Sequence, residues 1–492
     1  MLEDIQKATV RLEDSFAKLN IPKPALPKGT PSIDLRKPLP SNDALISLGR
    51  SVGVLTRFTE EGTQSASCMA EMLMYGLKGV AAYTDHSLMN GKESPEVYEY
   101  MHRALAFLVD PSLWSDLGAG LDLCLECGKI NVVSTAMLYN SNATLGVPSP
   151  DVVPIKPVPG KCILISGHDL IMTEALLKAC TPHGIKVYTH GELLPAHSYP
   201  KLREYGVLAG HFGGAWMRQS IEFPHFPGPV LMTTNCLTEP HESYRDTIFT
   251  AGAVGWEGVK HLGDDMSTLN LEPIVKAALA SKGFTAEDKE FSYPDPVGQK
   301  RAATYTVGFG HETILGAAGT IIEEIKKGNI TRFFLIGGCD GFEGQRSYYT
   351  DLVKNIPKTG VVLTLGCGKF RVNHLAEELG TIGDTGIPRI LDMGQCNDSY
   401  SAIQVALALA KALDCEVSDL PLTIALSWFE QKAVAVLLSC LHLGLKPLHL
   451  GPTLPAFVTP EILDVLVNKF GVQPTGDALA DMKKMTAAKG SS

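Results

Sequence analysis

Apolar and polar positions follow two different periods along this chain. Between residues 43 and 142, apolar residues recur every three or four positions, for example in SASCMAEMLMYGLKGVAAYTDHSLMNG and SPEVYEYMHRALAFLVD, and this spacing predicts helices. Beyond a Pro-rich stretch at 146–159, short apolar runs alternate with helical segments. Such alternation is typical of sheets with crossover helices. We therefore expect a helical N-terminal domain followed by two doubly wound, Rossmann-like α/β domains.

The same pattern predicts the limits of these domains. The helical domain is expected over residues 1–155, the first α/β domain over 156–312 and the second over 313–492. In the helical domain, residues 1–20 are expected to form an amphipathic helix, and the Pro-rich residues 21–42 an extended linker. A helix is expected at ETILGAAGTIIEEIKKG. Strands are expected at KCILIS, KVYTH, PVLMTTN and TYTVGF in the first α/β domain, and at RFFLIGG, GVVLTLG, RILDMG and LTIALSW in the second.

The overall charge indicates which kinds of partner to expect. The chain has 492 residues, a formal net charge of -10 and a sequence pI near 5.8. Nucleic acids and anionic membrane surfaces require a basic patch, so we expect neither as a partner and favour a small-molecule enzyme. The longest apolar run, AVAVLLSCL, is far shorter than the roughly 18 residues of a membrane span. The acidic N-terminus suits neither a secretory signal nor a transit peptide, so we expect a cytoplasmic protein.

Several potential metal ligands follow the expected strands directly. In an open parallel sheet, the loops after the strand C-termini face one crevice, so such residues converge in space. The interval from Cys339 to Cys367 is 28 residues, that from Cys367 to Cys396 is 29, and that from Cys396 to Glu430 is 34. Each interval fits one strand–helix–strand step of roughly 30 residues. The residues concerned are Glu192, Cys236, Cys339, Cys367, Cys396 and Glu430.

The size and chemistry of this set predict a metal cluster. Together with His168, it contains four thiols, two carboxylates and one imidazole. A single zinc ion takes four ligands, so the set is too large for one zinc. Thiolates select soft metals and iron–sulfur clusters, whereas carboxylate and imidazole add harder donors. We therefore expect a multinuclear iron site of mixed sulfur and oxygen character, and no disulfides.

The motifs around these residues resemble one known family. ISGHDL, YTHGELLPAH, MTTNC, IGGCDG, LGCGK, MGQCNDSYSAI and LSWFEQKAVAVLL are similar to the hybrid cluster proteins, also called prismane proteins or hydroxylamine reductases, over about residues 70–475. The resemblance implies the fold of the nickel–iron carbon monoxide dehydrogenases and a hybrid 4Fe-2O-2S cluster between two α/β domains. It also implies reduction of hydroxylamine to ammonia and water, or of nitric oxide, with a small redox protein or reductase as the electron donor.

The resemblance also assigns roles to residues. Lys432 corresponds to a lysine that lines the cluster pocket, and Cys339 to the cysteine that carries a persulfide. Lys432, Glu192 and His168 are the candidate proton donors for cleavage of the N–O bond. The implied ligands of the cluster are His168, Glu192, Cys236, Cys339, Cys367, Cys396 and Glu430.

The chain departs from the family pattern near its N-terminus. Relatives begin with a compact cysteine motif that binds a proximal cluster, whereas the first cysteine here is Cys68. We therefore do not expect a proximal 4Fe-4S or 2Fe-2S cluster. The C-x-x-C pair Cys124 and Cys127 is not expected to replace it, because such a cluster normally needs four ligands. The cysteines expected to pack as small apolar residues are Cys68, Cys162, Cys180, Cys415 and Cys440.

Other interpretations remain open at this stage. His168 alone could begin a helix, Glu192 or Glu430 could cap one or form an ion pair, and Lys432 could be solvated or ion-paired. A dinucleotide-binding enzyme would need G-x-G-x-x-G after a strand, and GFGHET fails at the third glycine. A non-catalytic cluster-binding or nitrosylation-relay protein, and a closed structural zinc site, are the remaining alternatives.

Overall fold

The structure is a computed structural model that describes residues 17–18, 41–51, 64–294, 302–339, 347–427, 430–455 and 457–487. The expected N-terminal helix and Pro-rich linker lie almost entirely outside these residues.

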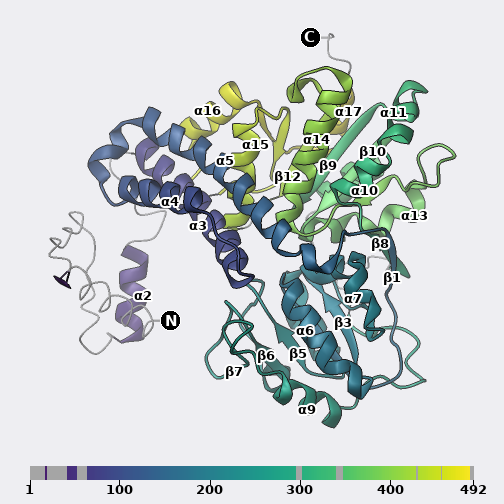
Figure 1. The fold of residues 1–492 in the computed structure, drawn as a ribbon. Helices are drawn as coiled ribbons and strands as arrows, with labels where there is room; N and C mark the ends of the chain where they lie inside the picture. The colour runs from purple at the N-terminus through teal and green to yellow at the C-terminus, as the bar shows by residue number, and fades with distance from the viewer. Residues whose placement is uncertain are drawn as a thin grey trace.

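The helical pattern of the N-terminal part is confirmed by four α-helices within its described residues. α4 has proline at its first position, where the missing N–H costs no hydrogen bond, and α5 is capped by Asp116, whose side chain accepts from the backbone N–H of Ala119. The long helices α3 and α5 pack against one another along the side of the molecule (Figure 1). The bounds are α2 Asn42–Ser51, α3 Gln64–Met89, α4 Pro95–Leu108 and α5 Leu117–Ser141.

The first parallel sheet has six strands in the order β4-β3-β2-β5-β6-β7. Its central strand β2 is buried at every position, which explains a continuous apolar run in place of an alternating one. The strands are β2 Cys162–Ser166, β3 Lys186–His190, β4 Leu208–His211, β5 Val230–Met232, β6 Ile248–Thr250 and β7 Lys260–His261. Its helices include α6 Leu170–Cys180, α7 Pro200–Glu204, α8 Gln219–Glu222 and α9 Glu272–Ala280.

The second parallel sheet repeats this arrangement in the order β11-β10-β9-β12-β13-β14. Numbered within each sheet, both orders are 3-2-1-4-5-6, the order of a dinucleotide-binding sheet. The strands are β9 Arg332–Gly338, β10 Gly360–Leu365, β11 Ile390–Asp392, β12 Leu422–Ser427, β13 Leu448–Leu450 and β14 Val472–Pro474. The helices are α10 His311–Gly316, α11 Ala318–Lys326, α12 Tyr348–Lys354, α13 Ala376–Leu379, α14 Ser399–Leu413, α15 Gln431–His442, α16 Pro460–Phe470 and α17 Ala478–Thr486.

Two sequence expectations differ from the structure. TYTVGF does form a strand, β8 (Thr304–Val307), but this strand pairs antiparallel with β1 (Asp151–Pro154) outside both parallel sheets. The single helix expected after it is divided into α10 and α11 at Ala317, whose backbone leaves the helical region. Both differences are local, and the doubly wound architecture predicted from the alternating pattern is present.

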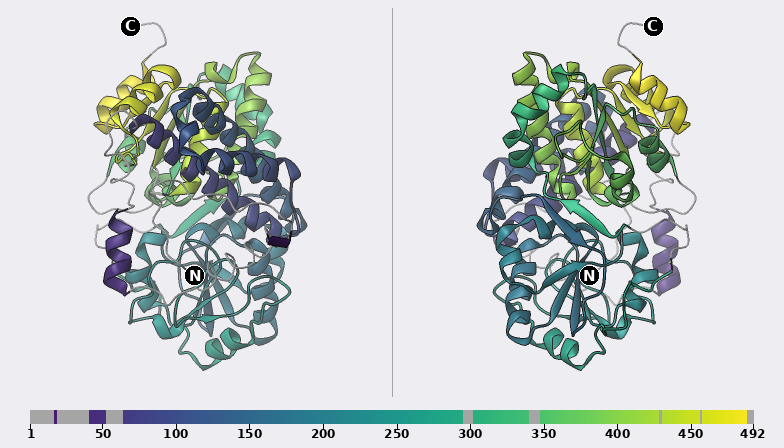
Figure 2. Two further views of the ribbon diagram at one scale, coloured as in Figure 1. Left: turned by 90° about the vertical axis from the view of Figure 1, so that its left-hand side faces the viewer. Right: turned by 90° about the vertical axis from the view of Figure 1, so that its right-hand side faces the viewer.

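The two sheets form two lobes, and most of α3, α4 and α5 lies beside the lobe of the second sheet (Figure 2). α3 and α5 pack on α15 and share one continuous apolar cluster with the second sheet. The first sheet has separate apolar clusters on its two faces. The proposed domain limits at residues 155 and 312 stay a prediction. Within the described residues, no helix combines the length and the apolar character that crossing a membrane requires.

Candidate metal centre

The predicted ligands come together where the carboxyl ends of the two sheets meet. In the first sheet, β2 and β5 are neighbours at the point where the strand order reverses, and His168 and Cys236 follow them. β9 and β12 occupy the same place in the second sheet and are followed by Cys339 and Glu430. Ligands of doubly wound sheets bind at this reversal point. Here two such points face one another.

Short helical turns supply the remaining predicted ligands. Glu192 lies on the 3-10 helix η5 (Gly191–Ser198) after β3, Cys367 begins η9 (Cys367–Arg371) after β10, and Cys396 begins η11 (Cys396–Asp398) after β11. All seven predicted ligands line one cavity of about 280 Å³. Since one water in the liquid occupies about 30 Å³, this cavity has room for a group of several atoms.

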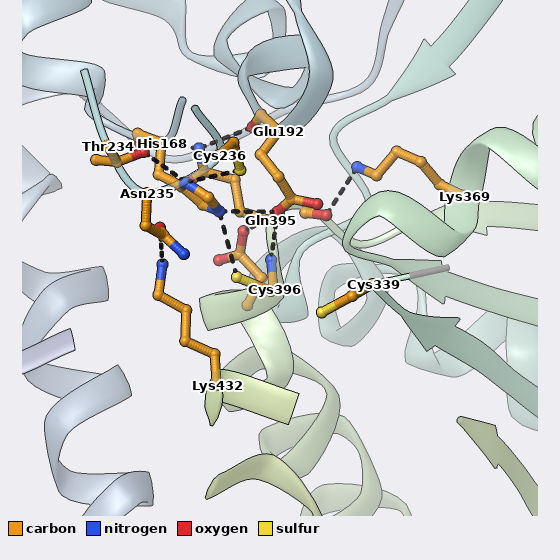
Figure 3. Close-up of polar contacts among 12 residues, drawn as sticks. His168, Glu192, Thr234, Asn235, Cys236, Cys339, Lys369, Gln395, Cys396 and Lys432 are labelled. Carbon is orange, nitrogen blue, oxygen red and sulfur yellow. Dashed lines mark hydrogen bonds and ion pairs between the residues drawn. The ribbon is translucent and has the colours of Figure 1, made fainter. Parts of the chain in front are cut away.

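Three of the seven residues form a tight group of potential metal ligands. The Nε2 atom of His168 lies 3.5 Å from Sγ of Cys396 and 3.6 Å from Oε2 of Glu192. One ligand atom from each residue lies within 4.8 Å of the others. The backbone N–H of Cys396 donates to Oε2 of Glu192 at 2.8 Å, which ties the two lobes together beside His168 (Figure 3).

The orientation of His168 is set by its other ring nitrogen. Nδ1 lies 2.7 Å from Oγ1 of Thr234 and 3.9 Å from Sγ of Cys236. A hydrogen bond of this kind fixes the ring of a metal-binding histidine and leaves the opposite nitrogen for the metal. It is Nε2 that is directed toward Cys396 and Glu192.

A chain of polar contacts joins the remaining residues of the site. Sγ of Cys339 lies 3.8 Å from Oε1 of Glu430, whose Oε2 accepts from the amide of Asn235 at 3.0 Å. Nζ of Lys432 donates to Oδ1 of the same Asn235 at 2.7 Å (Figure 3). Lys432 is buried, so its interpretation as a solvated residue is wrong.

The backbone beside the ligands depends on a glycine and on one buried polar side chain. Gly338 has φ of 120°, and a Cβ there would overlap the carbonyl oxygen of Ser427. The Gln395 amide donates to the carbonyl oxygens of His168, at 2.9 Å, and Glu192, at 2.8 Å. These contacts hold the loop before Cys396 against the other lobe.

Burial shifts the pKa values of the predicted ligands toward their neutral forms. It raises the pKa of the Cys236 and Cys367 thiols well above the usual range and that of Cys396 to about 12. Burial also raises the pKa of the Glu192 carboxyl and lowers that of His168 well below its usual value. Without a cation the thiols stay protonated, whereas a bound metal ion deprotonates a coordinating thiol.

The donor set fits a multinuclear metal group. Oε1 of Glu192 is buried and has no hydrogen-bond partner among the described residues, which is costly unless something else binds it. Seven converging sulfur, oxygen and nitrogen donors exceed the four of a zinc site. Mixed soft and hard donors suit iron held by both sulfur and oxygen.

The sequence prediction missed residues that shape the site without being expected ligands. Asn235 and Gln395 stand directly before Cys236 and Cys396, so their positions next to predicted ligands were the available signal. Lys369 makes a fully buried ion pair with Asp392 at 2.7 Å, and its position two residues after Cys367, in LGCGK, was the available signal.

Fold and site together define a two-lobed α/β protein with a candidate metal centre between facing parallel sheets. The model of the Prismane/CO dehydrogenase family matches residues 22–483, and the chain belongs to this family. It is 48% identical to a protein named hydroxylamine reductase from Zymomonas mobilis, over 91% of this chain and 78% of that protein. A protein of the same name from Geobacter metallireducens is also 48% identical, over 90% and 76%.

Solved structures of carbon monoxide dehydrogenases share the fold. The enzyme from Thermococcus sp. AM4 aligns with a TM-score of 0.61 and 15% identity, over 85% of this chain and 84% of that one. Carbon monoxide dehydrogenase IV from Carboxydothermus hydrogenoformans has the same TM-score at 16% identity, over 98% and 82%. At such identities the similarity shows the fold alone.

Proposed function

We propose that this chain is an iron–sulfur oxidoreductase that reduces hydroxylamine to ammonia and water. The observation that carries the proposal is the convergence of all seven predicted ligands on one cavity between two strand-reversal points. Its relatives at 48% identity, named hydroxylamine reductases, support the choice of substrate.

We assign the binding of a hybrid 4Fe-2O-2S cluster to these seven residues. When bound, such a cluster supplies electrons and Lewis acidity. Cys339 is the proposed persulfide site. The residues that would hold the cluster are His168, Glu192, Cys236, Cys339, Cys367, Cys396 and Glu430.

The chain's own polar groups would deliver the protons. Cleavage of the N–O bond of hydroxylamine consumes two electrons and two protons and yields ammonia and water. Lys432 is the best placed donor, because its ammonium is buried and held by Asn235 beside Cys339 and Cys396. Glu192, with one oxygen lacking a partner among the described residues, is the second candidate. His168 is the third, although the contact of Nδ1 with Thr234 favours a ligand role.

Electrons would come from a small redox protein or a reductase and enter this cluster directly. Four of the eleven cysteines belong to the proposed site. Cys124 and Cys127 are buried on α5, and Sγ of Cys124 lies against Sδ of Met69 at 3.7 Å. A cluster of the proximal type needs four ligands, and this pair supplies two. We therefore propose that the chain as given holds no proximal cluster.

The test begins with iron and acid-labile sulfide per chain, and the electron paramagnetic resonance spectrum, of anaerobically purified protein. We expect iron for one tetranuclear cluster and turnover of hydroxylamine with a reduced donor. Cys339→Ser should lose the turnover, and the matched control Cys124→Ser should keep it. Equal loss in both variants would contradict the assigned roles.

Other outcomes point to other functions. Turnover of nitric oxide alone would indicate a nitric oxide reductase with the same centre. A full cluster without turnover of either substrate would indicate a non-catalytic cluster-binding or nitrosylation-relay protein. Protein with zinc in place of iron would contradict the proposal.

A further inference from the structure

A second, smaller cavity adjoins the candidate metal centre. Its volume is about 30 Å³, which is enough room for a water-sized group. Gly338, Cys339 and Cys396 line both this side cavity and the large one. The side cavity therefore opens onto the same sulfur atoms from the direction of α3 and α15.

Tyr83 supplies an unused donor to this side cavity. The residue lies on α3, is 1% exposed and has no proposed role as a metal ligand. Among the described residues, its buried hydroxyl has no hydrogen-bond partner. Buried hydroxyls are almost always bonded, because an unpaired one loses its hydration without compensation. A ligand in the adjoining cavity would satisfy it.

Neighbouring groups keep this phenol neutral and hold it in place. Burial raises the pKa of Tyr83 well above its usual value, so the phenol keeps its proton. Nζ of Lys432 lies 5.3 Å from the centre of the Tyr83 ring while it donates to Asn235. Tyr83 is therefore a neutral donor whose ring lies beside Lys432 in the lining of the side cavity.

The rest of the wall restricts the ligand to a small neutral molecule. Apart from Tyr83, Lys432, Ser427 and the two cysteines, the side cavity is lined by glycine and by aliphatic residues of the second sheet and α15. An anion larger than water would not fit, and a free cation would lie against Lys432. A single oxygen atom with lone pairs would fit and would accept from the phenol.

We propose that the side cavity binds the oxygen end of hydroxylamine, and then the water released from it, through a hydrogen bond donated by Tyr83. This inference rests on the proposed function. The phenol keeps its proton, and the two protons and two electrons of the reaction come from the donors named above. Because negative charge builds on this oxygen as the N–O bond breaks, the hydrogen bond strengthens toward the transition state. Removal of one such donor typically lowers kcat by roughly 10²–10³-fold.

The test replaces only the hydroxyl, in the cluster-loaded protein. Tyr83→Phe should lower kcat for hydroxylamine by at least about tenfold. Its iron and sulfide content, its resonance spectrum before substrate and its thermal midpoint should match the wild type. The matched control is Tyr100→Phe on α4, a fully buried tyrosine whose hydroxyl donates to the carbonyl of Leu123 at 2.9 Å away from the site. This control should keep the full kcat.

A second variant tests the cavity independently of the phenol. Ala433→Val adds two methyl groups to the wall of the side cavity and leaves Tyr83 unchanged. We expect kcat to fall here too, again with normal iron content.

Each outcome gives a decision. If Tyr83→Phe keeps kcat within about tenfold of the wild type or loses iron, or if Ala433→Val keeps the full kcat, the inference is overturned while the proposed function stands. If the wild-type protein assembles no cluster or turns over no hydroxylamine, the proposed function fails, and the inference fails with it.

Discussion

The Lys369 side chain is a charge held entirely inside the protein. Its Nζ atom lies 2.7 Å from Oδ1 of Asp392 and 2.7 Å from the carbonyl oxygen of Gly394, in the loop that leads to Cys396. The backbone N–H of Gly394 donates to the same carboxylate oxygen at 3.0 Å. This ion pair therefore fixes the turn between β11 and the candidate metal centre.

Removing one partner of this ion pair should destabilise the protein by far more than the intact pair stabilises it. In Lys369→Met, the Asp392 carboxylate is left buried without its cation, and we expect the free energy of unfolding to fall by about 3–5 kcal/mol. Chemical denaturation of the purified chain measures this. Lys276→Met is the control, because Lys276 pairs with Glu272 at an exposed position, and it should leave stability nearly unchanged. Equal effects would contradict the structural role of Lys369.

Helix α15 is the element that connects the helical part of the chain to the site. It begins directly after Glu430, carries Lys432 in its first turn and packs against α3 and α5. α3 and α5 approach α15 closely because each has a glycine at the contact. A Cβ on Gly79 would lie 2.6 Å from the carbonyl oxygen of Gln431, and one on Gly128 would overlap the backbone at Leu438.

An added methyl group should therefore push α15 away. Gly128→Ala places an atom against backbone, which cannot move aside as a side chain can, and overpacking of this kind costs about 1–3 kcal/mol. We also expect less iron per chain, because the displaced helix carries Lys432 and follows Glu430. Iron analysis and thermal unfolding measure the two effects.

A glycine-to-alanine substitution at a position with no close neighbours should instead stabilise the protein. A Cβ on Gly319, in α11, would meet nothing within 4 Å. Gly319→Ala should thus stabilise the chain by about 0.5–1 kcal/mol, because alanine loses less conformational entropy in a helix. A gain in stability in Gly128→Ala would contradict the close packing of α15.

At the scale of the molecule, two sheets of identical strand order face each other through their carboxyl ends. The first sheet and its loops supply His168, Glu192 and Cys236 to the cavity, and the second supplies three cysteines and Glu430. A group bound by all seven would join the lobes, in addition to the hydrogen bonds of Gln395.

Loss of the proposed cluster should lower the stability of the whole protein. A ligand that binds only the folded state stabilises it by mass action. We expect the thermal midpoint of iron-depleted protein, prepared with a chelator under reducing conditions, to lie at least several degrees below that of the loaded protein. The same treatment of Cys339→Ser should produce a smaller shift. Identical midpoints of loaded and depleted wild type would show that the cluster does not join the lobes.

The sequence predicted the convergence of the candidate ligands better than the pairing of individual strands. Largely apolar segments of six or seven residues, such as β9 and β10, predicted strands whose order then placed Cys339 and Cys367 at one end of the sheet. The strands β7 and β13, of two and three residues, were not predicted from the pattern. The partner of β8 lies about 150 residues earlier, and Gln395 bonds His168 across more than 220, so local patterns contain no signal for either contact.

The scattering of the candidate ligands along the chain has a consequence for biosynthesis. The first, His168, and the last, Glu430, are separated by about 260 residues. At a synthesis rate of about 5–20 residues per second, the ribosome needs roughly ten seconds to a minute to pass from one to the other. During this interval the early ligands exist without their partners, so no nascent chain offers a complete site until its final strands emerge. Delivery of iron and sulfide is therefore an event that follows translation, and the cell must protect the exposed thiols until then.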